Sequence, residues 1–147
     1  MDDSLIKEND KKKRYLKRYK KNIALIERLE DKLIDLNNRI YKIKSPSLSA
    51  MPKGSQVVDL SDLISDKEEL IDRIKRLKKK GKRLKAETIS IIDELDDVRY
   101  AEVLEAFFID CKTFEDISED MGYTTRHVIK LYTEAISNIS ITSLNGQ

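Results

Sequence analysis

The stretch Thr113–Leu131, TFEDISEDMGYTTRHVIKL, decides the fold that the sequence predicts. Its first threonine can cap a helix, and two acidic residues follow in the opening turn, where the helix dipole favours negative charge. Gly122 stands where that helix would end, because glycine adopts a positive φ at little cost. Thr124 can cap a second helix. This order predicts two short helices joined by a tight turn, which is typical of a helix-turn-helix whose second helix enters the DNA major groove.

The spacing within this stretch separates an inward face from an outward face. Ser118 takes a crowded position that needs a small side chain. Helical spacing predicts that the apolar positions face inward, and these are Phe114, Ile117, Met121, Val128 and Leu131. The predicted DNA-binding residues point outward from the second helix, and these are Thr124, Thr125, Arg126, His127 and Lys130, with Ile129 beside them.

Each outward side chain has a chemistry that suits DNA. Arg126 can read guanine through two hydrogen bonds, Lys130 can meet a phosphate or a guanine, and threonine hydroxyls suit phosphates. For His127, the only histidine, a contact with solvent or phosphate is expected rather than a catalytic role. Cys111 precedes the first helix, where we expect a buried or boundary position rather than a reactive one.

A further apolar cluster before this stretch predicts a helix that covers it. Val103, Leu104, Phe107 and Phe108 follow an i, i+1, i+4, i+5 pattern. The predicted small core is completed from the C-terminal side by Ala135, Ile136 and Ile139. Residues 99–140 therefore form the predicted helix-turn-helix domain, and residues 141–147 are predicted to be a flexible tail.

Two long amphipathic segments precede that domain. Residues 1–10 are polar and expected to fray, and a coiled-coil-like seam then runs from Leu16 to Ile43. A loop is expected at 45–58, because it holds both prolines, and Asp59 is the expected N-cap of the next helix. A second heptad series extends from Leu60 to Val98. The fold class is thus all-α, with residues 1–98 forming a basic arm, either as an antiparallel helical hairpin or as a coiled coil between chains.

The composition indicates in which cellular compartment the protein is expected. The chain has 147 residues, of which 38% are charged, and a single cysteine, which fits a reducing compartment. No run approaches the roughly 20 apolar residues of a membrane span, and the N-terminus lacks the apolar core of a signal peptide. We expect a cytoplasmic protein without membrane contact.

The charges are unevenly distributed along the chain. Residues 11–44 hold thirteen Lys or Arg against four Asp or Glu, and residues 73–85 hold nine basic residues and no acid. Residues 93–120 reverse the balance with eleven acids and two bases. The arm residues predicted to contact phosphates are Lys78, Lys79, Lys80, Lys82 and Arg83. A solvated helix face is the equally weighted alternative, and the acidic stretch must face away from DNA or bind a basic protein.

Enzyme chemistry finds less support in the sequence. There is no metal-ligand spacing, no phosphate-binding glycine loop and no nucleophile beside the sole histidine. We therefore expect no catalysis, no metal and no cofactor.

Residues 99–139, RYAEVLEAFFIDCKTFEDISEDMGYTTRHVIKLYTEAISNI, resemble region 4 of sigma-70-type factors. More closely, the chain resembles small regulators of phages and prophages of Gram-positive bacteria, of the RinA and ArpU type. Residues 51–55, MPKGS, resemble a motif in that group, so the phage likeness covers most of the chain. The departures are Phe107 and Asn138 in place of basic residues and Cys111 in place of a glycine, which removes two phosphate contacts and implies a strained turn.

The resemblance implies a transcription regulator that binds double-stranded DNA, alone or alongside RNA polymerase or a sigma factor. Two alternatives stay open at this point. One is a protein-interaction module that docks on the polymerase or a sigma factor through the arm or the acidic stretch. The other is a structural coiled-coil phage component. A homo-oligomer, if one forms, is expected to form through the helical arm.

Overall fold

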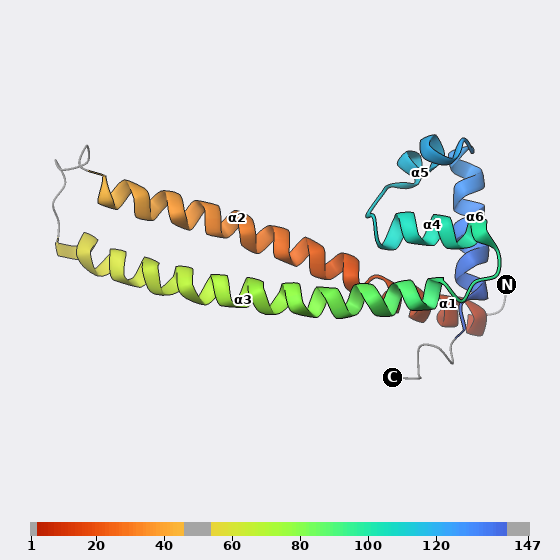
Figure 1. Ribbon diagram of the computed structural model, residues 1–147, viewed down its shortest axis with the longest axis horizontal. Helices are drawn as coiled ribbons and strands as arrows, with labels where there is room; N and C mark the ends of the chain where they lie inside the picture. Colours follow the sequence, from red (N-terminus) through yellow and green to blue (C-terminus); the bar gives the residue numbers. More distant parts are fainter. Residues whose placement is uncertain (1–2, 46–53, 141–147) are drawn as a thin grey trace. The chain divides into compact units, whose positions relative to one another are not determined.

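The described part of the chain consists of α-helices joined by short turns. The computed structural model describes residues 3–45 and 54–140, with side chains in the second stretch described from residue 60 onward. The predicted all-α class is confirmed for these residues, and no described helix is both long and apolar enough to cross a membrane. In chain order (Figure 1) the helices are α1 (Asp3–Leu16), α2 (Arg18–Lys44), α3 (Gly54–Ile92), α4 (Val98–Phe108), α5 (Phe114–Met121) and α6 (Thr125–Asn138).

The chain divides into two compact units, and the division differs from the predicted domain boundary after residue 98. The terminal unit combines Met1–Lys21 with Gly81–Gln147, and the middle unit is Asn22–Lys80. The boundary moves because α1 and the end of α3 supply core residues to the terminal unit: Leu16 is fully buried there, together with Ile91 and Ile92.

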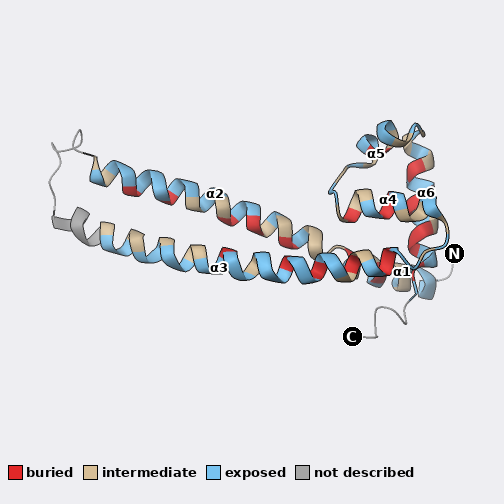
Figure 2. Ribbon diagram, viewed as in Figure 1, coloured by how far each residue is buried: buried red, intermediate tan, exposed pale blue. Residues whose placement is uncertain are grey.

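The terminal unit has a continuous core built from all of its helices. Figure 2 shows buried positions on each of α4, α5 and α6. Every residue of α4, α5 and α6 predicted for the core is buried or packed against it, which confirms the inward positions. The buried core residues are Leu16, Ile91, Ile92, Val103, Leu104, Phe108, Ile117, Val128, Leu131, Tyr132, Ala135, Ile136 and Ile139.

The N-terminal helix is part of this unit, and the expectation that residues 1–10 fray is wrong for residues 3–10. The α1 helix packs against α6. Its Lys12 is only 2% exposed, and the Lys12 ammonium donates to the Ser137 carbonyl at 3.3 Å. Asn9 donates to the Ser137 hydroxyl at 3.2 Å. These contacts use the carbonyl and hydroxyl at the C-terminal end of α6, where a cation is favoured by the helix dipole.

The α4 helix is fixed at its start and to α6. Asp97 caps α4 by accepting from the Arg99 amide at 2.9 Å, and its pKa is lowered chiefly by hydrogen bonds from the Arg99 side chain. The Tyr100 hydroxyl donates to the Glu134 carboxylate at 2.7 Å, which raises the pKa of Tyr100. Together these bonds fix the position of α4, which packs against both α5 and α6.

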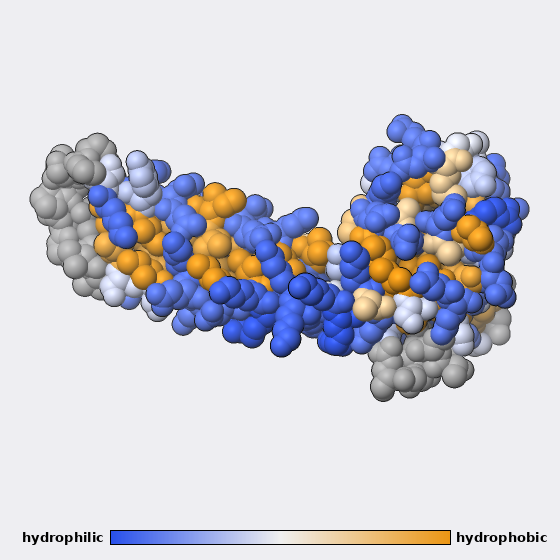
Figure 3. Space-filling view, viewed as in Figure 1, coloured by the Kyte–Doolittle hydropathy of each residue, from blue (hydrophilic) through white to orange (hydrophobic). Residues whose placement is uncertain are grey.

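The middle unit holds residues 22–44 of α2 beside residues 54–80 of α3. Its described core is the buried set Ile26, Leu29 and Ile74, with Leu70 and Leu77 among the half-buried residues around it. Glu30 pairs with Lys78 at 3.2 Å, so the middle of α2 lies beside the second half of α3. Hydrophobic side chains remain visible along this unit in Figure 3, and Ile34 and Tyr41 are 58% and 73% exposed.

Three helix boundaries differ from the predicted ones. The seam expected from Leu16 to Ile43 is divided between α1 and α2 at Lys17, where the Lys17 amide still donates to the Lys13 carbonyl at 3.0 Å and Arg18 Nε donates to the Tyr15 carbonyl at 3.0 Å. The α3 helix begins at Gly54, so residues 54–58 are helical and Asp59 is not its N-cap. It ends at Ile92, before the predicted end at Val98. Predictions for residues 46–53 and for the tail at 141–147 lie outside the described residues.

Candidate nucleic-acid interface

The α5 helix begins and ends as its sequence predicts. The Thr113 hydroxyl accepts from the Asp116 amide at 3.1 Å, and the Asp116 carboxylate accepts from the Thr113 amide at 3.4 Å. This reciprocal pair is a capping box, which satisfies two amides that a helix start leaves without partners. The helix ends at Gly122, whose φ of 72° is left-handed as predicted.

The turn between α5 and α6 is held by Ser118. Its carbonyl accepts from the Gly122 amide at 3.0 Å and from the Tyr123 amide at 3.2 Å. Its hydroxyl donates to the Tyr123 carbonyl. A short side chain with a hydroxyl is therefore used at the position where the sequence predicts a small residue. The result is a turn whose backbone is bonded on both sides, so α6 starts at a fixed point relative to α5.

The α6 helix divides into an inward and an outward face. Thr124 caps it by accepting from the His127 amide at 3.1 Å, which confirms the predicted cap. Val128, Leu131 and Ala135 are buried on the inward face. That burial fixes the rotation of the helix, so Arg126, Ile129 and Lys130 point outward.

The structure brings the five predicted DNA-binding residues together at the start of α6. Arg126 and Lys130 are exposed one turn apart, and Thr124 is exposed at the cap. Thr125 is half-buried. His127 is also half-buried, with its ring edge-on to Tyr123 at a centroid distance of 4.8 Å, so this ring packs on the turn. Ile129 adds an exposed apolar side chain to the same face.

The entry to α5 contains the expected strained residue. Cys111 has a φ of 57°, the left-handed region in which a non-glycine residue is disfavoured. Its side chain is exposed, so the expected buried or boundary position is wrong. The reason is local: the Lys112 amide donates to the Ala106 carbonyl at 3.0 Å, and this return of the chain to the end of α4 directs residue 111 outward. Lys112 then reaches Asp120 at 2.6 Å, which raises the pKa of Lys112.

Aromatic side chains from α4, α5 and α6 form a cluster that was not predicted from the sequence. Phe107 stacks on Phe114 at a centroid distance of 4.8 Å and meets Tyr132 edge-on at 5.1 Å. The Lys20 ammonium lies 3.7 Å from the centroid of Phe107, and burial lowers the pKa of Lys20. Burial also raises the pKa of Tyr132 to about 12. The Lys20 ammonium thus lies over Phe107, the residue that stands where the sigma region 4 pattern has a basic residue.

Acidic side chains surround the outward face of α5. Glu115, Asp116, Glu119 and Asp120 are all exposed on this eight-residue helix. They extend the negative stretch predicted from the sequence onto the surface beside α6. A phosphate group approaching α6 would be repelled from the side of α5, so this charge disfavours the approach of a polyanion from that side.

The five arm residues predicted to contact phosphates are all exposed on α3. Lys78 pairs with Glu30, and Arg83 pairs with Glu87 at 3.1 Å. Lys79, Lys80 and Lys82 complete the set within about a turn and a half of helix. Both the phosphate-contact interpretation and the solvated-face interpretation are compatible with this exposure.

Comparison with models of protein families, with curated proteins and with solved structures found no match to this chain. Among residues 3–45 and 54–140, no group of His, Cys, Asp and Glu side chains is arranged to hold a metal ion.

Proposed function

We propose that this chain is a transcription regulator of the phage and prophage type that binds double-stranded DNA. In this proposal α5 and α6 form a helix-turn-helix, and α2 and α3 form a two-helix arm. The observation that carries the proposal is the start of α6, where a capped, rotationally fixed helix exposes Arg126 and Lys130 on one face. That arrangement is what a recognition helix needs in order to place side chains in the major groove.

The roles of the residues follow from their chemistry. Arg126 lies in the first turn, where a guanidinium can donate two hydrogen bonds to one guanine. Lys130 lies one turn further and can meet a phosphate or a guanine. The Thr124 hydroxyl accepts from a backbone amide, and its own proton remains available to a phosphate oxygen. The Thr125 hydroxyl can also donate to a phosphate of the DNA backbone. The free amides at the start of α6 and the positive end of its helix dipole attract the same phosphate group.

Electrostatics favour weak binding by the isolated α5–α6 segment. The exposed acids of α5 oppose phosphates, whereas the cations of α3 attract them. Binding by the intact chain should therefore be stronger than its net charge of +2 suggests and should fall steeply with salt.

The test is binding of the intact chain to fragments of the DNA that flanks its own gene, across a salt series. Arg126→Ala should cost about 1–3 kcal/mol for one preferred fragment and relax the preference among fragments. Lys130→Ala should weaken binding to all fragments and lower the salt slope by about 1 if it contacts a phosphate. Lys7→Ala is the matched control, because Lys7 is an exposed lysine on α1. Absence of binding by the intact chain at low salt contradicts the proposal.

A second function is favoured by the acidic surface of α5. Four exposed carboxylates on one short helix suit a basic protein surface, such as one on RNA polymerase or a sigma factor. Co-purification with polymerase that survives Arg126→Ala, and is lost when Glu115 and Glu119 are both changed to Gln, would favour this docking function over DNA reading.

A further inference from the structure

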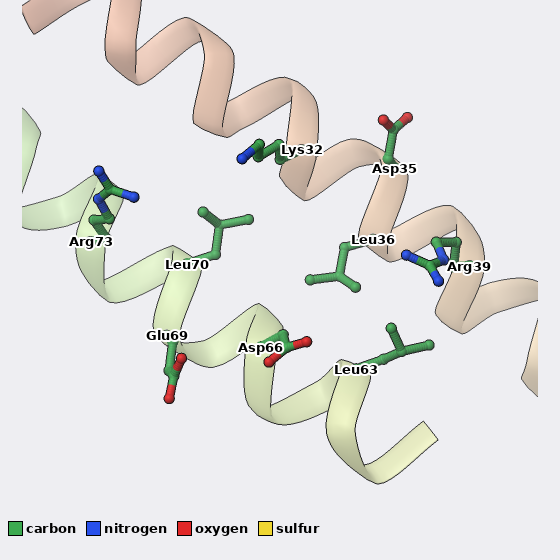
Figure 4. Close-up of a pocket in the computed structure, with 9 residues that line it drawn as sticks. All are labelled: Lys32, Asp35, Leu36, Arg39, Leu63, Asp66, Glu69, Leu70 and Arg73. Atoms are coloured by element: carbon green, nitrogen blue, oxygen red, sulfur yellow. The ribbon is translucent and has the colours of Figure 1, made fainter. Parts of the chain in front are cut away.

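A groove lies between α2 and α3 inside the middle unit. It has a volume of about 490 Å³ and is lined by nine residues (Figure 4). Three leucines, Leu36, Leu63 and Leu70, point into the space between the two helices and form its apolar floor. Leu63 and Leu70 are only half-buried, so this floor is incompletely covered within one chain.

Six charged side chains form the rim of the groove, in equal numbers of each sign. No ion pair joins any of them to another described residue. The three basic residues are Lys32, Arg39 and Arg73, and the three acidic residues are Asp35, Asp66 and Glu69. This arrangement contrasts with Glu30 and Lys78 nearby, which pair within the chain. An apolar floor with a charge-balanced, unpaired rim is what a self-complementary interface requires.

We propose that this groove is the contact surface for a second copy of the chain, and that the two middle units form a four-helix bundle. A twofold axis that crosses the groove near Leu36 and Leu70 places two copies face to face, running in opposite directions. Asp66 of each copy then meets Arg73 of the other, and Asp35 of each meets Arg39 of the other. Leucines from both copies fill the common interior.

Charge balance selects a second copy over other occupants. A strongly basic or acidic partner helix would leave three of the six rim charges facing a like charge. A wholly apolar partner would bury all six without compensation. A second copy satisfies both signs, because every acid–base contact occurs twice about the axis.

The experiment is sedimentation equilibrium of the full chain without DNA, over a range of protein concentration and with a thiol reductant because Cys111 is exposed. The expected mass at high concentration is twice 17.1 kDa. Asp66→Arg and Arg73→Asp should each weaken self-association by about tenfold, since each replaces two attractive contacts by two repulsive ones. Mixing the two variants in equal amounts should restore association, because a mixed pair again opposes unlike charges at both contacts.

Asp72→Arg is the matched control. Asp72 is exposed on the same helix but rotated by about 120° from Asp66, away from the groove. It should associate like the unchanged chain. Asp35→Arg and Arg39→Asp repeat the design on α2, and circular dichroism checks that each variant keeps its helices. A monomer at every concentration, or a mixture that associates no better than its separate components, overturns the proposal. Neither result bears on DNA binding, which is measured separately.

Discussion

The terminal unit and the middle unit are both built from α-helices, yet they bury their apolar residues very differently. The core cluster of the terminal unit contains thirteen buried residues, whereas the cluster of the middle unit contains three, with Leu36 and Ile40 buried outside that cluster. The reason is the number of directions from which each helix is covered. In the terminal unit α6 packs against α1, α4 and α5. In the middle unit each helix faces one other helix, so its flanks stay open.

The largest expected difference between the units is the cost of removing one core side chain. Phe108 is fully buried in the terminal unit, so Phe108→Ala should lower the free energy of unfolding by about 3–5 kcal/mol. Leu36 is 9% exposed and lines the groove of the middle unit, so Leu36→Ala should cost about 2 kcal/mol, the low end of the range for a buried leucine. Urea denaturation followed by circular dichroism, at one fixed protein concentration, measures both.

Equal losses of unfolding free energy for Phe108→Ala and Leu36→Ala would contradict the contrast between a closed core and an open one. Repeating the Leu36→Ala measurement at several protein concentrations sharpens it. If a second copy covers the groove, the loss should grow with concentration, whereas the loss for Phe108→Ala should not.

Local sequence signals predicted the start and end of α5 and the start of α6. Thr113, Gly122 and Thr124 act on amides or φ angles within a few residues of themselves, so neighbouring residues suffice to predict them. The inward positions of α4, α5 and α6 were also predictable, because helical spacing fixes which residues share a face. The positive φ of Cys111 was also predictable, because the sigma region 4 pattern that this stretch resembles has glycine at this position.

The docking of α1 could not be predicted in the same way. Lys12 and Ser137 are 125 residues apart, and residues 3–14 are mostly polar, so no apolar period marks them as core-forming. The contact of Lys20 with Phe107 is missed for the same reason. A lysine with a long apolar stem can be buried while its ammonium finds a carbonyl or a ring. Sequence spacing reports the period of a helix, and these contacts depend on which helices meet.

A second, smaller difference between the two units concerns how the free energy of unfolding depends on their tyrosines at high pH. Burial raises the pKa of Tyr132 to about 12, above the value near 10 of an exposed phenol. The protonated phenol therefore stabilises the folded state fully below pH 10, and this contribution is lost as the pH rises from 10 to 12. The loss is on the order of 2 kcal/mol. The free energy of unfolding should fall less steeply over this range in Tyr132→Phe than in the unchanged chain.

Tyr41 provides the control from the middle unit, because it is 73% exposed. Tyr41→Phe removes an exposed phenol and is measured beside Tyr132→Phe. If both variants flatten the curve equally, burial in the terminal unit is not the cause of the effect.

The smallest expected effects come from two backbone positions in the terminal unit that share a left-handed conformation. Gly122 has a φ of 72°, and a Cβ added there would meet nothing within 4 Å. Gly122→Ala should therefore cost only the conformational energy of the left-handed region, about 1–2 kcal/mol. Cys111 has a φ of 57° and already carries that cost. Cys111→Gly should relieve it, and the greater freedom of glycine in the unfolded chain offsets part of the gain, which leaves about 0.5–1 kcal/mol of added stability.

The two substitutions should thus shift the urea midpoint in opposite directions without changing the slope of the transition. A loss for Cys111→Gly would mean that the thiol side chain contributes more than its backbone costs. Under the proposed function, a stabilised variant that binds DNA no better than the unchanged chain would show that the strained turn does not control the position of α6. Stronger binding would show that the position of α5 and α6 depends on it.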